Sequence, residues 1–238
     1  YDGTVTAPLD TNNISYSGLV EGDDFTGTYT GVFADANVGT NKTVTITPTY
    51  SGADVGNYSV TDQSTATGNI VAKTLTATAS TANKVYDATN SATTSLTLSG
   101  LIGTETLTTS NTSTFNNKNV GTGKAVTVNS ITLTDGTGLA TNYSISPGQT
   151  TTANVTAKTL TANVSATNKV YDSTTLANTT LTLSGLIGSE TLNVTANSTF
   201  DNKNIGSGKT VTVNSITLTN GSNGGLAANY SIATSQTT

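Results

Sequence analysis

A Tyr-Asp pair recurs along this chain at a constant interval, at Tyr1-Asp2, Tyr86-Asp87 and Tyr171-Asp172, with 85 residues from each copy to the next. A long, fixed period is typical of one folding unit that has been copied along the sequence. The repeat constrains the fold, because whatever structure one copy forms the other two must form as well. It also favours a structural role over catalysis, because three near-copies supply length or a recurring surface, whereas a reaction needs one site.

The copies agree over most of their length. The segment 83–87 returns as 168–172, and the segment 96–103 returns as 181–188. Copies two and three differ in length by two residues in the Gly- and Asn-rich turn around 221–225, where a loop tip tolerates insertions. The first copy is more divergent but keeps the same frame. The period therefore predicts three domains: repeat 1 at 1–72, repeat 2 at 73–157 and repeat 3 at 158–238.

The local pattern predicts strands throughout. Apolar residues alternate with Thr, as in the run from Val126 to Val128, and this period of two is typical of strands with one packed face and one wet face. The Thr, Val and Ile residues that dominate such runs have β-branched side chains, which suit a pleated surface. Asn214-Ser215 interrupts the alternation and predicts a β-bulge or a short bend. We expect an all-β fold of three tandem small β-sandwich or β-grasp-like domains, with little or no helix.

The junctions between repeats have no flexible linker. Ile70 to Ala72 leads directly into Lys73, and Val155 to Ala157 leads directly into Lys158, without a Gly-, Ser- or Pro-rich spacer. We expect the last strand of one repeat to become the first strand of the next, and the three domains to form an extended rod. Repeat 1 lacks the Lys-Thr-Leu opening strand and repeat 3 lacks a closing strand, so we expect a window cut from a longer array.

The composition argues against several classes of function. The chain has no His and no Cys, which removes the usual general bases and thiol nucleophiles, and we expect that it is not an enzyme. Its net charge of -5 favours neither nucleic acid nor an anionic membrane as a partner, and it has no apolar run that could span a bilayer. We expect no cofactor. Ca²⁺ is the one metal for which the loops at Asp23-Asp24, Asp54 and Asp135 offer oxygen ligands, against the simpler interpretation of solvated loop acids.

The aromatic residues are few and hold fixed places in the repeat. We expect Phe33, Phe115 and Phe200 and the Tyr of each Asn-Tyr-Ser segment to anchor the cores. We expect the Tyr of each Tyr-Asp pair to pack at a junction, and the Asp to accept hydrogen bonds from backbone N–H groups in a turn. Tyr16, Tyr29 and Tyr50 occur in repeat 1 alone and are candidates for a ligand platform. The predicted structural framework consists of Tyr1, Asp2, Phe33, Tyr58, Tyr86, Asp87, Phe115, Tyr143, Tyr171, Asp172, Phe200 and Tyr230.

Several linked segments resemble a known family. They are Lys-Val-Tyr-Asp, Leu-Ser-Gly-Leu, Asn-Val-Gly followed by Gly-Lys, Asn-Tyr-Ser, and Val-Thr-Ala-Lys-Thr-Leu, in this order. Together they look like the YDG-type repeat, which is related to the MBG group and occurs in large bacterial surface adhesins of the filamentous-haemagglutinin kind. Copy one has Tyr1-Asp2-Gly3 itself, whereas the other copies have Ala88 and Ser173 in the third position. The resemblance implies an extracellular location on a diderm bacterium and a part in adhesion or biofilm formation. It brings no catalytic or ligand-binding residues.

Three hypotheses of function follow. The first is a structural stalk or fibre segment of a secreted adhesin or extracellular filament, whose partners are adjacent repeats of the same long chain or neighbouring copies in a fibre. The second is a carbohydrate- or receptor-binding module in repeat 1, with host or matrix glycans as partners. The third is a polymerising filament subunit completed by strands from neighbouring chains.

Overall fold

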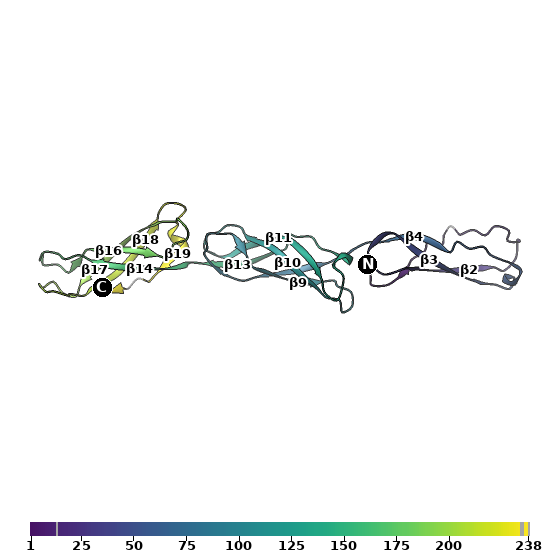
Figure 1. Ribbon diagram of the computed structural model, residues 1–238, viewed down its shortest axis with the longest axis horizontal. Helices are drawn as coiled ribbons and strands as arrows, with labels where there is room; N and C mark the ends of the chain where they lie inside the picture. Colours follow the sequence, from purple (N-terminus) through teal and green to yellow (C-terminus); the bar gives the residue numbers. More distant parts are fainter. Residues whose placement is uncertain (13, 234–235, 238) are drawn as a thin grey trace. The chain divides into compact units, whose positions relative to one another are not determined.

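The described residues form mainly strands, joined by turns and loops. The computed structural model describes residues 1–12, 14–233 and 236–237, and within them it contains strands, three short 3-10 helices and no α-helix. The strands follow one another along the whole chain (Figure 1). The predicted all-β fold is therefore confirmed. No helix in these described ranges is long and apolar enough to cross a membrane.

Packing divides the chain into two compact units, and the middle repeat contributes to both. Unit 1 comprises Tyr1–Thr78, Thr97–Ser110 and Ile131–Ser146. Unit 2 comprises Ala79–Leu96, Asn111–Ser130 and Pro147–Thr238. Each unit thus contains one junction between successive repeats together with the residues that pack on both sides of it. The repeat boundaries 1–72, 73–157 and 158–238 come from the period of the sequence. The division into compact units does not test them, so they stay a prediction.

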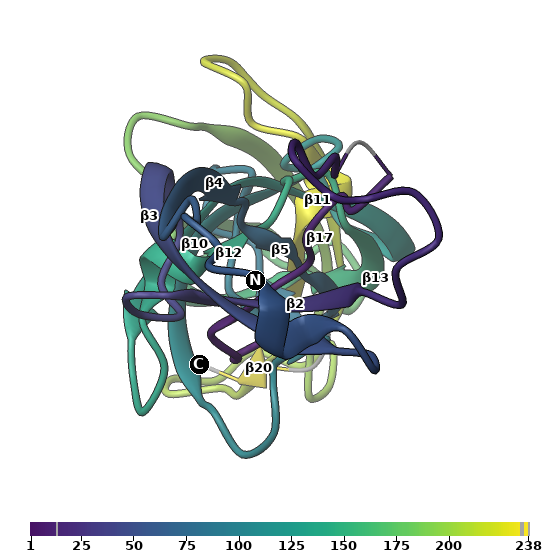
Figure 2. The same cartoon turned by 90° about the vertical axis from the view of Figure 1, so that its right-hand side faces the viewer.

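Unit 1 is built around a four-stranded antiparallel sheet. The strands lie in the order β1-β2-β3-β4, with bounds β1 Thr6–Ala7, β2 Thr26–Phe33, β3 Gly39–Ser51 and β4 Thr65–Ile70. Three of them, β2, β3 and β4, are labelled in Figures 1 and 2. Phe33 lies opposite Val44 across β2 and β3, and both pack with Ala7 in a small core. The unit also contains the pair β5 (Lys73–Thr74) and β12 (Tyr143–Ser144), and the 3-10 helices η1 (Val55–Asn57) and η2 (Ala140–Asn142).

Unit 2 contains a three-stranded and a four-stranded sheet from repeat 3, and strands from repeat 2. The three-stranded sheet is β16 (Thr179–Ser184), β14 (Lys158–Ala166) and β19 (Tyr230–Ile232). The four-stranded sheet is β15 (Leu176–Ala177), β17 (Leu192–Phe200), β18 (Val211–Asn220) and β20 (Gln236–Thr237), and η3 (Ala227–Asn229) precedes β19. From repeat 2 the unit takes β7 (Lys84–Val85), β8 (Ser91–Ala92) and β13 (Thr150–Thr156).

The remaining strands of repeat 2 continue from one unit to the other. They are β6 (Thr76–Thr81), β9 (Thr94–Ser99), β10 (Leu107–Phe115) and β11 (Gly121–Asp135). The five-stranded sheet of this repeat has the order β7-β13-β11-β10-β8, and β6 pairs with β9.

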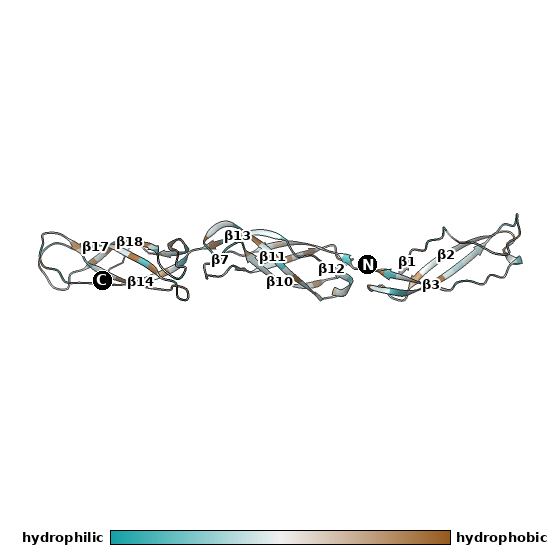
Figure 3. Ribbon diagram, turned by 90° about the horizontal axis from the view of Figure 1, so that it is seen from above, coloured by the Kyte–Doolittle hydropathy of each residue, from teal (hydrophilic) through white to brown (hydrophobic). Residues whose placement is uncertain are grey.

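Burial follows the predicted period of two. Hydrophobic and hydrophilic residues succeed each other along strands such as β11 and β18 (Figure 3). In β18 the alternation breaks at Asn214-Ser215, where the register against β17 shifts between Asn197 and Ser198. The predicted bulge is therefore confirmed. It resets the alternation, so that Val213 and Ile216 are both buried although three positions separate them.

The Tyr-Asp pair starts the same tight turn in every repeat. The carboxylate Oδ1 of Asp87 accepts hydrogen bonds from the backbone N–H and the hydroxyl of Thr89, both at 2.9 Å, and Asp172 binds Thr174 in the same way. This is the role of turn acceptor that the sequence predicts. A hydrogen bond from Lys169 is the largest of the effects that lower the pKa of Asp172, to about 2.

The turn requires a left-handed residue after the Asp, which explains the glycine in the motif. The φ angle is +78° at Gly3 and +63° at Ser173. A left-handed conformation costs a non-glycine residue about 1–2 kcal/mol, which the extra backbone entropy of glycine in the unfolded state partly offsets. We expect Ser173→Gly to raise the free energy of unfolding by roughly 0.5–1 kcal/mol, measured by urea denaturation.

The reverse substitution is the control for this prediction. We expect Gly3→Ala to destabilise unit 1, because a Cβ at Gly3 would lie 2.8 Å from Cγ2 of Ile102 in addition to adopting the unfavourable φ. Equal effects of the same sign from the two substitutions would contradict the backbone explanation.

Candidate functional site at the repeat junctions

The most elaborate polar arrangement in unit 2 lies where repeat 2 meets repeat 3. The hydroxyl of Tyr86 donates to Oε1 of Glu190 at 2.7 Å, and the hydroxyl of Tyr230 donates to Oε2 of the same carboxylate at 2.6 Å. The two rings are edge to face, with centroids 5.4 Å apart and an interplanar angle of 79°. Such a pair is favoured by the ring quadrupoles. One carboxylate therefore joins a tyrosine of the preceding repeat to a tyrosine of its own repeat.

This junction is almost closed to solvent. Tyr86 is 1% exposed, Tyr230 5% and Glu190 7%. Buried acids require partners, and here both carboxylate oxygens have a hydrogen bond while Nζ of Lys118 lies 3.5 Å from Oε1. Burial by itself raises the pKa of Glu190, but the hydrogen bonds from Tyr230 and Tyr86 and the charge of Lys118 together outweigh it and hold the pKa below its ordinary value. Glu190 is therefore ionised in the fold at neutral pH.

Unit 1 repeats the arrangement with its own residues at the junction of repeats 1 and 2. Tyr1 donates to Glu105 at 2.5 Å and Tyr143 donates to the same carboxylate at 2.6 Å. The rings of Tyr1 and Tyr143 are 5.3 Å apart at 78°. Each Asn-Tyr-Ser tyrosine also accepts a hydrogen bond from a backbone N–H of its own repeat, Ile102 in one case and Ile187 in the other. The same constellation thus recurs at both junctions, although Ala36 stands in repeat 1 where repeat 2 has Lys118.

A buried asparagine makes a second contact at each junction. Oδ1 of Asn229 accepts from the backbone N–H of Val120 at 2.9 Å, and its Nδ2 donates to Asn119 at 3.1 Å. Asn142 binds the N–H of Val38 and the side chain of Asn37 in the same way, both at 2.9 Å. Asn229 is 1% exposed and Asn142 2%. An amide that satisfies donor and acceptor at once fixes the register of the two repeats that it joins.

The backbone crosses each junction almost without interruption. β13 ends at Thr156 and β14 begins at Lys158, so a single residue separates them. β14 then pairs in parallel with β19, and Leu160 is 2% exposed in the core that also contains Tyr86. At the other junction the N–H of Leu75 donates to the carbonyl of Ser144 at 2.8 Å. The predicted direct passage from the last strand of one repeat to the first strand of the next is confirmed.

The ionisation of the junction tyrosines tests this geometry. The hydrogen bond to Glu105 is the largest of the effects that raise the pKa of Tyr1, to about 12, because a phenolate beside the carboxylate is disfavoured. We expect Glu105→Gln to lower the pKa of Tyr1 towards its ordinary value of 10.0, measured from the Cζ chemical shift during an alkaline NMR titration. Glu21→Gln, at an exposed acid of the same unit, is the control and should leave the pKa of Tyr1 near 12. If the pKa of Tyr1 were unchanged in the Glu105 variant, the hydrogen bond between Tyr1 and Glu105 would be contradicted.

The predicted framework residues lie in different environments. Among the phenylalanines, Phe33 and Phe115 are buried and Phe200 is half-buried. Among the Asn-Tyr-Ser tyrosines, Tyr143 and Tyr230 are buried and Tyr58 is half-buried. The Tyr-Asp tyrosines differ most, since Tyr86 is 1% exposed, Tyr1 is half-buried and Tyr171 is 55% exposed. The exposed Asp2, Asp87 and Asp172 form the turns described above.

Sequence reasoning missed the junction role of Glu105, Glu190, Asn142 and Asn229. The signal was present, because these residues recur in register with the tyrosines that they bind. Each of them, however, binds residues of the preceding repeat about 104 to 110 positions away. No pattern within one repeat reveals such a contact.

The acids considered as Ca²⁺ ligands are used in loops. Asp24 and Asp54 accept hydrogen bonds from the backbone N–H groups of Ala53 and Asp24 respectively, and Asp135 accepts one from Ala140. Asp23 accepts from the hydroxyl of Tyr58 at 2.6 Å. In the part of the chain that the structure describes, no three acidic residues lie close enough together to hold a metal ion.

The tyrosines peculiar to repeat 1 line a cavity of about 570 Å³ together with Asp62 and Gln63. The hydroxyls of Tyr16 and Tyr29 are 2.8 Å apart, and Tyr50 donates to Asp62. By strand register, Tyr29 and Tyr50 correspond to Ala196 and Leu218 of repeat 3, which pack in the core beneath Ala162 of β14. These tyrosines therefore occupy a face that a strand covers in repeat 3.

Comparison with known proteins gives one match. The family model described as YDG domain matches the chain three times, over residues 1–67, 71–153 and 156–238. No curated protein and no solved structure matches the chain.

Proposed function

Because the chain belongs to the YDG domain family, with three tandem copies along its length, we propose that it is a structural stalk segment of a secreted bacterial adhesin or extracellular filament. In this proposal the repeats position other domains at a distance from the cell surface, in adhesion or in a biofilm matrix, and catalyse no reaction. Their partners are adjacent repeats of the same kind. The location is extracellular, on the bacterial surface.

The observation that supports the proposal is that the two junctions are built from the same contacts. Both use the same tyrosine–carboxylate–tyrosine contact and the same asparagine, and at both the chain passes from one repeat to the next within one or two residues. A buried, hydrogen-bonded and repeated interface fixes successive modules to each other, which is what a stalk requires. The content of charged residues is low, 10%, and the exposed strand faces are rich in Thr. Both favour a hydrated surface without a strong electrostatic field that would attract charged ligands.

Small-angle X-ray scattering of the purified chain tests the mechanical part of the proposal. Three repeats of roughly 35–45 Å each predict a longest dimension of about 105–135 Å, estimated from the usual length of strands and their loops. A compact globular protein with the same number of residues would have a diameter of about 45–50 Å. We expect the double variant Glu190→Ala/Asn229→Ala to show a broader distance distribution than the wild type, because it removes the polar contacts of one junction. A compact particle, or identical distributions for the two proteins, would contradict the stalk.

Carbohydrate binding by repeat 1 is a second candidate, favoured by the cavity with three tyrosines, an acid and an amide. Aromatic faces beside hydrogen-bonding groups suit sugars. A glycan array probed with the chain, and with Tyr29→Ala as the matched variant, separates the candidates. Saturable binding that the variant loses supports this module, whereas the stalk proposal expects no binding by either protein.

A further inference from the structure

The two junctions differ in one residue of the leading repeat and in one turn of the repeat that follows it. At the junction of repeats 2 and 3, the leading repeat has Lys118 where the leading repeat of the other junction has Ala36. The following repeat there has a turn at 220–226, which is two residues longer than its counterpart at 135–139. Lysine thus occurs with the longer turn, and alanine occurs with the shorter one.

The hydrogen bonds of the two turns identify the additional residues. In each turn one carbonyl accepts a closing bond from a glycine N–H, and it belongs to Gly138 in the shorter turn and to Gly225 in the longer, both at 3.1 Å. Asn223-Gly224 is therefore the insertion. Both of its residues have a left-handed backbone, with φ of +55° and +87°, and Nδ2 of Asn223 donates to the carbonyl of Ser189 at 3.0 Å. The insertion thus has a defined conformation next to the residue that precedes Glu190.

The shorter turn packs against the acid of its junction. Gly138 is buried, and a Cβ added to it would overlap Oε2 of Glu105 and lie 3.0 Å from the carboxyl carbon. The backbone of the turn therefore lies on this carboxylate. An ammonium group that approached the same carboxylate would compete with the turn for the space beside it.

The longer turn is drawn back from its acid, and the lysine lies beside the carboxylate. The three atoms nearest to a Cβ at Gly225 all belong to Thr191, the farthest at 3.1 Å, so Glu190 lies beyond them. Gly224 borders the ion pair instead, because a Cβ there would be 3.9 Å from Nζ of Lys118 and 4.0 Å from Oε1 of Glu190. The ammonium group is itself 3.5 Å from Oε1. The longer turn therefore accommodates lysine and acid side by side.

This ion pair differs from a surface pair because its acid is buried. The side chain of Glu190 is 6% exposed and that of Lys118 is 40% exposed. Pairs between two exposed groups contribute little, because water and salt screen them, whereas a carboxylate removed from water is screened less and depends on its partners. Tyr86 and Tyr230 bind this acid through neutral hydroxyls, so the lysine is the partner that balances its charge.

We propose that Lys118 and the longer turn form a matched pair that determines which repeat is favoured as the next neighbour. A repeat with lysine at this position prefers a following repeat whose turn carries the two-residue insertion, and a repeat with alanine prefers the shorter turn. The tyrosines, the acid and the asparagine are common to both junctions and join any two copies, and the lysine and the turn add a preference to that common contact. The preference is a property of the junction and does not depend on the role of the whole chain.

A double-mutant cycle in the full chain tests the pair. Its variants are Lys118→Ala, deletion of Asn223-Gly224, and the two changes together. We expect each single variant to speed hydrogen exchange at the amides of β14 and β19, because each one separates the lysine from its site. The combined change should fall short of the product of the single changes by about threefold or more, as for residues in contact. Fold changes that simply multiply would overturn the proposal.

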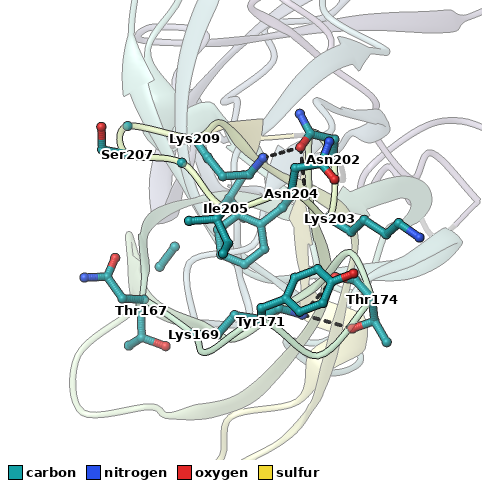
Figure 4. A pocket seen from close by; sticks show the side chains of 16 residues that line it. Thr167, Lys169, Tyr171, Thr174, Asn202, Lys203, Asn204, Ile205, Ser207 and Lys209 are labelled. Atoms are coloured by element: carbon teal, nitrogen blue, oxygen red, sulfur yellow. Dashed lines mark hydrogen bonds between the residues drawn. The ribbon is translucent and has the colours of Figure 1, made fainter.

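Two further substitutions separate the charge of the lysine from other effects. Lys118→Met keeps a long side chain and removes the charge, so it should replace Lys118→Ala in the cycle with the same result. Lys203→Ala is the matched control, because Lys203 holds the same position in repeat 3, is exposed and extends away from Ile205 and Lys209 (Figure 4). We expect it to leave exchange in β14 and β19 unchanged. The proposal fails if the Met variant keeps the coupling to the turn, or if Lys203→Ala acts as Lys118→Ala does.

The reverse exchange keeps the test decisive if the deletion disrupts the turn of repeat 3. Asn-Gly is inserted between Thr137 and Gly138, with Ala36 retained or with Ala36→Lys, which transfers the matched pair to the junction of repeats 1 and 2. We expect the insertion alone to speed hydrogen exchange at the amides of β5 and β12, and Ala36→Lys to reverse about threefold or more of that change. An insertion that has the same effect with Ala36 and with Ala36→Lys would contradict the matched pair.

Discussion

Replacing Tyr86 by alanine is expected to lower the free energy of unfolding of unit 2 by about 3–5 kcal/mol, the usual cost of removing a buried aromatic ring. Tyr86 is 1% exposed and packs with Phe115, Val155 and Tyr230 in one cluster. The substitution would leave a cavity at the junction and would also remove one of the hydrogen bonds to the Glu190 carboxylate. Urea denaturation followed by tyrosine fluorescence, together with hydrogen exchange at the amides of β14 and β19, measures the loss.

The chain supplies its own control for this prediction. Tyr171 occupies the same place in the next copy of the repeat but is 55% exposed, so we expect Tyr171→Ala to change the free energy of unfolding by no more than about 0.5 kcal/mol. Tyr86→Phe, which keeps the ring and loses the hydroxyl, should cost about 1.5–3 kcal/mol, the range for a hydrogen bond to a charged group. Equal losses from the alanine variants at Tyr86 and Tyr171 would show that the junction does not stabilise unit 2.

The second large effect is expected at the buried carboxylate. Glu190→Ala removes the carboxylate that accepts hydrogen bonds from the hydroxyls of Tyr86 and Tyr230. Because both hydroxyls then lack an acceptor in a buried site, we expect the free energy of unfolding to fall by about 2–4 kcal/mol. Glu190→Gln keeps one acceptor oxygen and nearly the same volume, so its loss should be smaller. Denaturation of the two variants in parallel with the wild type gives both values. A loss from the Ala variant no greater than that from the Gln variant would contradict the role of the carboxylate.

The pH dependence of stability follows from the same group. The pKa of Glu190 is lower in the fold than its ordinary value of 4.5, because the hydrogen bonds and Lys118 outweigh burial. The unfolded chain therefore binds this proton more readily than the folded chain, and the stabilisation is complete above about pH 4.5 and is lost as the pH falls through the folded pKa. We expect Glu190→Gln to reduce the loss of stability between pH 5 and pH 3, measured by urea denaturation at each pH. The tyrosines act in the opposite direction, since the raised pKa of Tyr86 predicts a loss of stability as the pH rises above about 10.

The sequence predicts the features that depend on residues close to one another in the chain. The alternation of Thr with apolar residues predicts strands, and the break at Asn214-Ser215 predicts the bulge, because the faces of a strand are set by its own period. The Asp of the Tyr-Asp pair is equally predictable, since its partner lies two residues away. In each case the cause and its effect lie within a few positions of each other.

The junction could not be predicted in this way. Tyr86 and Tyr171 follow the same Asn-Lys-Val and precede the same Asp, yet their exposed fractions differ from 1% to 55%. Tyr86 is enclosed by a carboxylate and a second ring that another repeat supplies. A buried Glu is also unexpected on composition alone, because an acid avoids the interior unless distant residues supply its hydrogen bonds. The environment of such residues depends on the neighbouring copy and not on the surrounding sequence.

The middle repeat contributes a different half of the joint at its two ends: Tyr86 and Asn119-Val120 at one, and Glu105 and Asn142-Tyr143 at the other. Loss or duplication of one whole copy by recombination within the gene would therefore bring matching halves together again. Array length can then change in single steps during evolution while every joint keeps its partners, and no compensating mutation is needed.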